Sequence, residues 1–299
     1  MPAVTLLDGA MGTELQRRGV EVPSHITSVW SAQALIDAPE AVLGVHRDYI
    51  EAGADVITVN NYSLTPPLLA RAGLESRLDE LTNAAIDLAQ RAVEEAAGGR
   101  RVRIAGSLPP LATSYRFDEV GEGPAILEDY RRIARLLAPR VDVLLCETLS
   151  CIREAEAAQR ASRETDREVW LSWTLRGDLF DRLPSGESLE EACEGALALG
   201  ADAYLVNCCG ANIATRAVAT LAAKTDAPVG AYANSFEVTP GDPEGRRPLP
   251  ENLPGRHLRV EGYAAEVARW LEAGATIVGG CCGTTPRHVA RLRELVGGL

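Results

Sequence analysis

The sequence predicts a single (β/α)8 barrel, and three observations lead to that prediction. Apolar runs of strand length alternate with helix-like runs along all 299 residues, and eight such apolar runs can be recognised. These runs are continuously apolar, which is typical of parallel strands buried on both faces. Glycine precedes several of them, at residues 52–54, 199–201 and 273–275, where a helix would end. A barrel of this kind needs about 250 residues, so the chain can hold one with insertions.

The expected strands are short and follow one another at regular intervals. In chain order they cover residues 4–7, 55–60, 102–105, 141–146, 169–173, 203–207, 228–231 and 276–278. A helix begins at Pro39, because apolar residues recur on one helical face, namely Ala41, Val42, Val45, Tyr49 and Ile50. Further helices are expected at residues 66–72, 77–97, 125–137, 151–161, 189–198, 212–223, 262–273 and 287–296.

A doubly wound open sheet is the alternative to the barrel. It is less well supported, because no G-x-G-x-x-G sequence follows the first strand. Residues 240–254 are rich in proline, glycine and charge, which predicts a surface excursion after the seventh strand. The chain contains no linker or low-complexity segment, so we expect residues 1–299 to form one domain.

Composition narrows the class of protein. The net charge of −12 argues against a nucleic-acid partner, because phosphates require a basic surface. No apolar run approaches the ~18–20 residues that a membrane span requires, so no membrane association is expected. The first residues do not resemble a secretory signal, which predicts a cytoplasmic protein. Seven cysteines do not suggest a disulfide framework, and in a reducing compartment paired cysteines more often bind metal or react.

The most informative stretch is the end of the eighth strand, where Gly-Gly-Cys-Cys-Gly at residues 279–283 leads into a helix start at Thr284-Thr285-Pro286. Adjacent side chains of a regular strand point to opposite faces. Cys281 and Cys282 can therefore face one metal only if the backbone leaves strand geometry, which the glycines permit. The simpler interpretation is a pair of buried apolar thiols.

In a barrel of this type the active site lies at the carboxyl ends of the strands. Polar residues and thiols occupy those positions in this sequence. In strand order they are Asp8; Asn60, Asn61 and Tyr62; Ser107; Glu147 and Thr148; Trp173 and Thr174; Asn207, Cys208 and Cys209; Asn234 and Ser235; and Cys281 and Cys282. We interpret the remaining cysteines, Cys146, Cys151 and Cys193, as core, helix-face or bystander residues.

Three or four thiols thus converge from the sixth and eighth strands, which suits zinc (Zn²⁺). A catalytic zinc keeps three protein ligands and leaves one position for water or substrate. Three thiolates make zinc a poor activator of water, but a substrate thiol bound there would be held as thiolate. This favours alkylation of sulfur over hydrolysis. The alternative is a structural four-cysteine site that includes Cys209, although two adjacent pairs chelate less well than C-x2-C motifs.

Five segments resemble the homocysteine S-methyltransferase family, which includes the betaine and S-methylmethionine enzymes. They are residues 7–15 (Leu-Asp-Gly-Ala-Met-Gly-Thr-Glu-Leu), 29–32 (Val-Trp-Ser-Ala), 146–148 (Cys-Glu-Thr), 206–208 (Val-Asn-Cys) and 279–282 (Gly-Gly-Cys-Cys). The segments span the chain in the family's order, and the last two together are specific.

The resemblance implies a homocysteine-binding barrel and particular site residues. Zinc would be bound at the catalytic centre by Cys208, Cys281 and Cys282. Cys209 occupies a position where the family does not use cysteine as a zinc ligand. Asp8 and Glu147 fall where the family places carboxylates around the substrate amino acid; the alternatives are a helix cap for Asp8 and a solvated loop charge for Glu147. Further substrate-binding candidates at the strand ends are Asn60, Tyr62, Asn207 and Asn234.

The expected reaction is methyl transfer from a cationic donor to the thiol of homocysteine, giving methionine. Trp30, Tyr62 and Trp173 are candidates to face the donor cation, or else belong to the core. S-Methylmethionine is the expected donor, ahead of S-adenosylmethionine, with little use of betaine. The sequence departs from the S-methylmethionine enzymes at residues 106–111 and at Gly283, both of which could border the donor pocket.

Other functions remain open at this point. A redox or zinc-sensing protein would use the same thiols without a substrate pocket, and a non-catalytic barrel would hold zinc with four protein ligands. A methyltransferase could also act on a different thiol or selenol. The oligomeric state cannot be predicted from the sequence.

Overall fold

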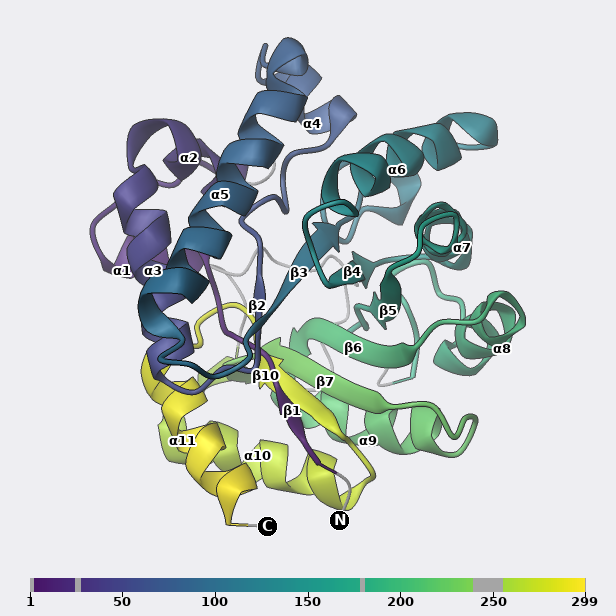
Figure 1. Ribbon diagram of the computed structural model, residues 1–299. Helices are drawn as coiled ribbons and strands as arrows, with labels where there is room; N and C mark the ends of the chain where they lie inside the picture. The colour runs from purple at the N-terminus through teal and green to yellow at the C-terminus, as the bar shows by residue number, and fades with distance from the viewer. Residues whose placement is uncertain (1–2, 25–27, 178–180, 239–254, 299) are drawn as a thin grey trace.

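The computed structural model describes residues 3–24, 28–177, 181–238 and 255–298. Eight parallel strands form one sheet, in which each strand except β1 and β2 is paired with a strand on both sides (Figure 1). In chain order they are β1 (Thr5–Leu6), β2 (Val56–Thr58), β3 (Arg103–Leu108), β4 (Val143–Leu149), β5 (Glu168–Trp173), β6 (Ala203–Gly210), β7 (Val229–Asn234) and β10 (Ile277–Gly280).

The sheet closes between β1 and β2. Its strand order is β1-β10-β7-β6-β5-β4-β3-β2. At the seam the Asp8 amide donates to the Val56 carbonyl at 3.0 Å, and the Asp55 amide donates to the Leu6 carbonyl at 2.7 Å. The predicted barrel is therefore confirmed and the open-sheet alternative is wrong.

Helices surround the barrel and connect successive strands (Figure 1). They are α1 (Gly12–Arg17), α2 (Ala34–Asp37), α3 (Pro39–Glu51), α4 (Pro66–Arg71), α5 (Leu78–Ala96), α6 (Pro124–Leu137), α7 (Ile152–Arg163), α8 (Leu189–Leu199), α9 (Ala211–Ala222), α10 (Val260–Glu272) and α11 (Pro286–Gly297). None of the described helices is both long and apolar enough to cross a bilayer.

All the expected strands are present, and the differences lie in short elements. α1 and α2 were not predicted, because a helix of one or two turns shows no clear periodicity. A small antiparallel pair, β8 (Phe236–Val238) with β9 (Gly255–His257), follows β7. The predicted excursion at residues 240–254 lies outside the described residues.

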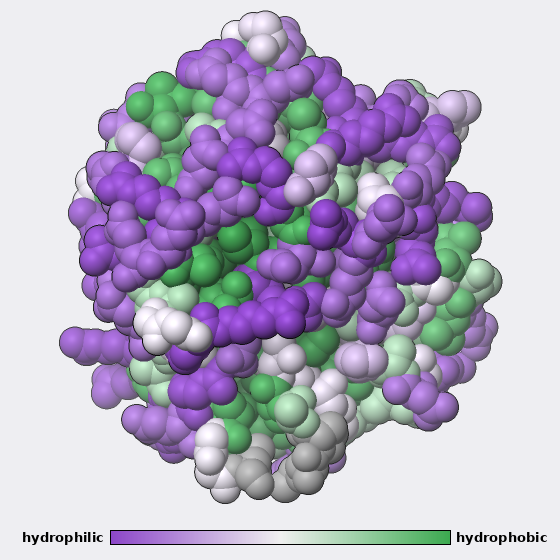
Figure 2. All heavy atoms as spheres, in the orientation of Figure 1, coloured by the Kyte–Doolittle hydropathy of each residue, from purple (hydrophilic) through white to green (hydrophobic). Residues whose placement is uncertain are grey.

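The protein has two apolar cores, one inside the barrel and one between the strands and the surrounding helices, and alternate residues of each strand point into one or the other. Leu7, Val56, Leu145, Trp170 and Leu205 are among those that fill the barrel interior. The opposite strand faces pack against the helices, as Cys146 and Cys209 do. Hydrophilic side chains cover most of the face drawn in Figure 2, including the exposed sides of α5 and α6.

At the amino ends of the strands, three aspartates cap alternate strands, β1, β3 and β5, in the same way. Each precedes a strand and accepts the amide of the strand before it: Asp55 from Leu6 at 2.9 Å, Asp142 from Ile104 at 2.8 Å and Asp202 from Val169 at 2.8 Å. This end of the barrel, which we call the base, is thus held by repeated and regular contacts.

Candidate active site

A pocket with a volume of about 130 Å³ lies at the carboxyl ends of the strands, which we call the mouth. Its walls come from β2, β4, β6, β7 and β10 and from the segments that follow β1, β2, β3 and β10. The lining residues used below are Asp8, Trp30, Ser31, Thr58, Asn60, Tyr62, Ser114, Tyr115, Glu147, Cys208, Tyr232, Cys281 and Cys282.

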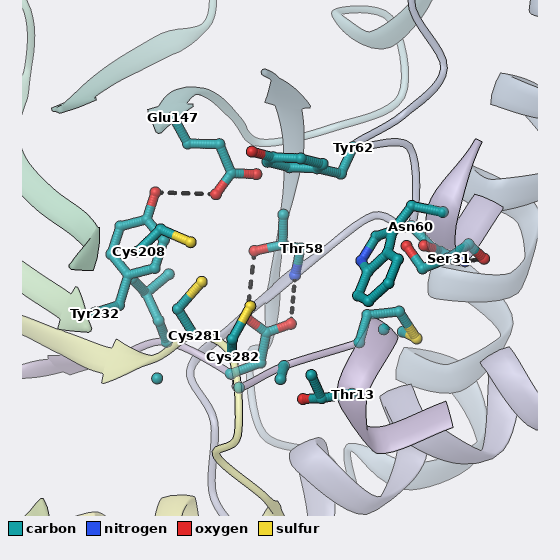
Figure 3. Close-up of a pocket in the computed structure, with 18 of the residues that line it drawn as sticks. Thr13, Ser31, Thr58, Asn60, Tyr62, Glu147, Cys208, Tyr232, Cys281 and Cys282 are labelled. Atoms are coloured by element: carbon teal, nitrogen blue, oxygen red, sulfur yellow. Dashed lines mark hydrogen bonds between the residues drawn. The ribbon is translucent and has the colours of Figure 1, made fainter. Parts of the chain in front are cut away.

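Three of the predicted thiols meet in this pocket. The Sγ atoms of Cys208, Cys281 and Cys282 lie within 4.8 Å of one another, and Figure 3 shows them side by side. Cys208 is buried, whereas Cys281 and Cys282 are partly exposed to the pocket. The prediction that these three thiols converge is confirmed by their geometry.

The turn after β10 brings Cys281 and Cys282 to the same side. Gly283 has φ +81°, and a Cβ atom there would lie 2.3 Å from Ser235 Oγ, so this position favours glycine. The Cys282 amide donates to Asn234 Oδ1 at 3.0 Å, and the Cys281 amide donates to the Ala233 carbonyl at 2.8 Å. These contacts with the end of β7 hold the turn in the geometry that the two thiols need.

Next to this turn, the α10 residue Tyr263 joins β10, which leads into the turn, to the neighbouring strand β7. The Tyr263 hydroxyl lies 2.8 Å from both the Ala233 and Gly279 carbonyl oxygens. Its ring is fully buried and packs edge-on against Trp270 at 5.7 Å between centroids. Tyr263 therefore fixes the spacing of β7 and β10 just before Cys281.

Cys208 reaches the pocket because β6 is irregular at its end. The pairing of β6 with β7 shifts between Asn207 and Gly210, and Cys208 has φ +53°. β4 shows a matching shift, with Thr148 at φ +60°. Left-handed backbone is uncommon for residues other than glycine and persists where surrounding contacts impose it.

Asn207 supplies those contacts by joining the two irregular strand ends. Its Oδ1 accepts the Thr148 amide at 2.8 Å and the Ser172 hydroxyl at 2.7 Å, and its Nδ2 donates to Thr148 Oγ1 at 2.8 Å. Asn207 is fully buried and lies outside the pocket lining. Its position indicates a role in placing Cys208 and Glu147.

The loop after β3 contributes Ser114 and Tyr115 to the pocket. The Tyr115 hydroxyl is 2.7 Å from Cys208 Sγ, and Tyr115 has φ +70°. Residues 106–111, which the sequence suggested as a border of the donor pocket, do not line the pocket, and Leu111 instead anchors this loop. Leu111 is held through its carbonyl by Thr65 Oγ1 at 2.7 Å and through its amide by Glu154 at 3.2 Å.

The thiol set fits a zinc ion. Tetrahedral zinc with Zn–S bonds near 2.3 Å places its sulfur ligands about 3.8 Å apart, within the spread seen here. Hydrogen bonds with Cys208 and Cys282 raise the pKa of the Cys281 thiol above its usual value. Three thiolates at this spacing repel one another, so a bound cation would be needed to keep all of them ionised.

Two buried carboxyl groups lie beside the thiols. Asp8 Oδ2 accepts the Thr58 amide at 2.7 Å, and Glu147 accepts the Ser107 hydroxyl at 2.6 Å. Glu147 also accepts the Tyr232 hydroxyl at 3.1 Å (Figure 3). Burial raises the pKa of Asp8 to about 7 and the pKa of Glu147 to about 7. Asp8 is not a helix cap and Glu147 is not solvated, so both carboxyls are available to a buried cationic group.

The aromatic candidates separate into two groups. Trp30, in the 3-10 helix at Trp30–Gln33, and Tyr62, after β2, line the pocket and are partly buried. Trp173 does not line the pocket; it is fully buried and stacks on Tyr204 with centroids 6.4 Å apart. Trp173 is therefore a core residue.

The structure brings most of the predicted site residues together and adds others. Of the substrate-binding candidates, Asp8, Trp30, Asn60, Tyr62 and Glu147 line the pocket. Asn207 and Asn234 lie behind its wall and hold backbone amides, so direct substrate contact by them stays a prediction.

Sequence reasoning missed two residues that bind the buried carboxyls. Thr58 and Tyr232 line the pocket as partners of Asp8 and Glu147. Thr58 lies two positions before Asn60, and Tyr232 lies two positions before Asn234. Residues two positions apart in a strand point to the same face, so this spacing was the signal that could have identified Thr58 and Tyr232.

Comparisons with known proteins agree with this site. The sequence model of the family described as homocysteine S-methyltransferase matches residues 5–296. A homocysteine S-methyltransferase of Escherichia coli is 32% identical, covering 97% of this chain and 94% of its own length. The homocysteine S-methyltransferase YbgG of Bacillus subtilis is 30% identical over 96% of this chain and 92% of its own length. The crystal structure of the E. coli homocysteine methyltransferase MmuM in a metallated form superposes with a TM-score of 0.80 at 29% identity, covering 98% of this chain and 96% of that one.

Proposed function

The chain belongs to the homocysteine S-methyltransferase family and is a zinc-dependent methyltransferase, and we propose how the residues of its pocket divide the reaction between them. The reaction is transfer of a methyl group from a cationic donor to the sulfur of homocysteine, giving methionine. The observation that carries the assignment of roles is the meeting of three thiols and two buried carboxyls in one pocket.

Cys208, Cys281 and Cys282 are the residues that would hold zinc, because they are the described cysteines whose thiols meet. When bound, zinc keeps the homocysteine sulfur as a nucleophilic thiolate at neutral pH. Cys209 lies in the outer core and is not a ligand in this proposal. The side chains around the thiols hold them in place, mainly through Asn234, Asn207 and Tyr263.

Asp8 and Glu147 bind the ammonium group of homocysteine. A carboxyl whose pKa is raised by burial becomes ionised more readily when a cation enters beside it. Thr58, Ser107 and Tyr232 donate hydrogen bonds to these carboxyls and keep them directed toward the pocket. The amino acid is thereby oriented with its sulfur toward the three cysteines.

The methyl donor occupies the side of the pocket lined by Trp30 and Tyr62. Attack on a sulfonium or ammonium methyl group converts a cation into a neutral leaving group, so charge disappears in the transition state. An aromatic, water-poor wall binds the cation without the strong solvation that would oppose this change. We propose S-methylmethionine as the preferred donor, then S-adenosylmethionine, with little use of betaine.

A donor competition assay tests this assignment. Zinc-loaded protein with saturating homocysteine is offered S-methylmethionine, S-adenosylmethionine and betaine together, and the demethylated products are quantified. We expect S-methylmethionine to be consumed fastest. Preference for betaine would contradict the donor assignment, and absence of methionine with all three would contradict the proposed function. Replacing homocysteine with selenohomocysteine or another thiol in the same assay identifies the preferred acceptor.

The same function has consequences for the domain organisation, the partners and the cellular location of the protein. Residues 1–299 act as one homocysteine-binding barrel, with small-molecule substrates as partners rather than nucleic acid. A cytoplasmic location is proposed, because the three thiols bind zinc only when reduced. A redox function and a zinc-sensing function are both less well supported, because neither function would require two buried carboxyls beside the thiols.

A further inference from the structure

Asn60 carries a buried hydrogen-bond acceptor that has no partner. The residue follows β2, lines the pocket and is only 2% exposed. Its Nδ2 donates to the Ser31 carbonyl at 2.9 Å, whereas its Oδ1 has no hydrogen-bond partner. A buried polar atom without a partner is costly and uncommon, and in a residue that lines a pocket it points to a donor that a ligand brings.

The orientation of this amide is set by its neighbour. Ser31 offers its carbonyl oxygen, which can only accept a hydrogen bond. Rotating the Asn60 amide by 180° would bring two oxygen atoms into contact and lose the hydrogen bond at 2.9 Å. Oδ1 is therefore the atom left without a partner.

The adjacent residue shows the same amide fully used for structure. Asn61 accepts the Ser107 amide at 3.0 Å and donates to the Ser107 carbonyl at 2.7 Å, which joins the end of β2 to β3. Asn61 needs no ligand to satisfy its polar atoms. The contrast between the two neighbours makes Asn60 the one suited to binding.

The position of Asn60 points to the methyl donor rather than to homocysteine. Asn60 and Ser31 lie on the opposite side of the pocket from the three cysteines, whereas Glu147 lies closer to the thiols (Figure 3). Ser31 also belongs to the same 3-10 helix as Trp30. A donor whose sulfonium lies against the aromatic wall would extend its other groups toward Asn60.

The chemistry of the pocket restricts what this donor can be. Of the described residues that line the pocket, none is lysine, arginine or histidine, so acceptors predominate there. A sulfonium or a quaternary ammonium carries no N–H, whereas the α-ammonium of an amino acid carries three. We propose that Asn60 Oδ1 binds the α-ammonium of the methyl donor and thereby selects amino-acid sulfonium compounds over donors that lack an N–H group. This inference rests on the proposed function and adds a specificity-determining residue to it.

The test uses a donor that differs from S-methylmethionine only by the missing amino group, 4-(dimethylsulfonio)butanoate. kcat/KM for each donor is measured with zinc-loaded protein at saturating homocysteine. Wild type is expected to prefer S-methylmethionine by about tenfold to hundredfold, as for a lost hydrogen bond to a charged group. Asn60→Leu keeps the side-chain size, and it should reduce this preference to within about threefold by slowing S-methylmethionine alone.

Gln159 supplies a matched control far from the pocket. Its amide is also buried between helices, with Nε2 bonded to the Ala196 carbonyl at 2.9 Å and Oε1 without a partner. Gln159→Leu should leave the donor preference unchanged. If Asn60→Leu does not fold, Asn60→Ala tests the same atom.

The outcomes separate the inference from the proposed function. An equal loss with both donors in the Asn60 variant, or a wild type without preference, would overturn the inference and leave the proposed function standing. A wild type that makes no methionine from either donor would contradict the proposed function itself.

Discussion

The base of the barrel has regular backbone geometry and repeated aspartate caps, whereas the mouth departs from regular geometry where its reactive groups lie. At the base, Asp55, Asp142 and Asp202 repeat one contact on alternate strands. At the mouth lie the non-glycine residues that have positive φ in the described chain, Trp30, Tyr115, Thr148 and Cys208. Such conformations cost of order 1–3 kcal/mol each.

The difference indicates that the contacts at the base stabilise the fold, whereas the strained backbone at the mouth lowers stability and positions the thiols and carboxyls of the pocket. Strained residues persist when their surroundings over-determine them, as the hydrogen bonds of Asn207 do for Thr148. Substitutions at the mouth should therefore reduce function more than stability, and substitutions at the base should do the reverse.

The largest effect is expected from the three mouth cysteines. Cys208→Ser, Cys281→Ser and Cys282→Ser should each lose most of the bound zinc and more than about a hundredfold in activity, since loss of an outer-shell partner alone costs up to that much. Metal analysis of the purified variants and a methionine-formation assay measure both.

Cys209→Ser is the control, because Cys209 is adjacent in sequence but lies in the outer core. It should retain zinc and activity. Loss of zinc in Cys209→Ser together with retention in Cys208→Ser would show that the ligand assignment is wrong.

A smaller effect is expected at the buried carboxyl beside the thiols. Glu147→Gln keeps the shape but removes the charge that pairs with the substrate ammonium, so homocysteine binding should weaken by roughly 1.5–3 kcal/mol. Zinc content should not change. Calorimetric titration measures the affinity, and Glu266→Gln, at a buried carboxyl of α10, serves as the control. Equal affinity in wild type and Glu147→Gln would remove Glu147 from the binding site.

His46, on α3 in the layer of helices around the barrel, tests protein stability at a position away from both the base and the mouth. It is fully buried, both ring nitrogens lack partners, and burial lowers its pKa from 6.5 to about 4. Below pH 6.5 the unfolded chain binds a proton that the folded protein excludes, so stability falls as the pH decreases from about 6.5 toward 4.

At pH 5 this loss amounts to about 2 kcal/mol relative to pH 8. His46→Leu should remove that part of the pH dependence. Denaturant unfolding of both proteins at the two pH values measures the difference. The same loss in wild type and variant would exclude His46 as its source.

The smallest effect is expected at the base. Asp142→Ala removes the acceptor of the Ile104 amide and should lower the free energy of unfolding by about 0.5–1.5 kcal/mol, with kcat/KM unchanged. Asp142→Asn keeps an acceptor and should lose less. A drop in kcat/KM without a change in stability would contradict the separation of base and mouth.

The fold could be predicted from sequence because buried parallel strands read as uninterrupted apolar runs. The elements that were missed are short: α1, α2 and the β8–β9 pair have too few residues to show periodicity. Strand ends were also underestimated, since β4 and β6 continue beyond the predicted ends at residues 146 and 207, through Glu147 and Cys208 respectively.

The site could be predicted only in part, and the two adjacent cysteines of β6 show why. Ala203 and Leu205 point into the barrel, so strict alternation would direct Asn207 and Cys209 inward as well. The shift at the end of β6 reverses this, placing Cys208 in the pocket and Cys209 in the outer core. Family resemblance identified Cys208, whereas residue spacing alone did not distinguish it from Cys209.

The central claim is that three cysteines hold zinc and leave its fourth position for homocysteine, and X-ray absorption at the zinc edge tests it most directly. Zinc-loaded protein should show three sulfur neighbours and one lighter neighbour before homocysteine is added, and four sulfur neighbours afterwards. Selenohomocysteine should replace the fourth sulfur with selenium at the same site. Four sulfur neighbours before substrate, or no change when homocysteine is added, would contradict the account.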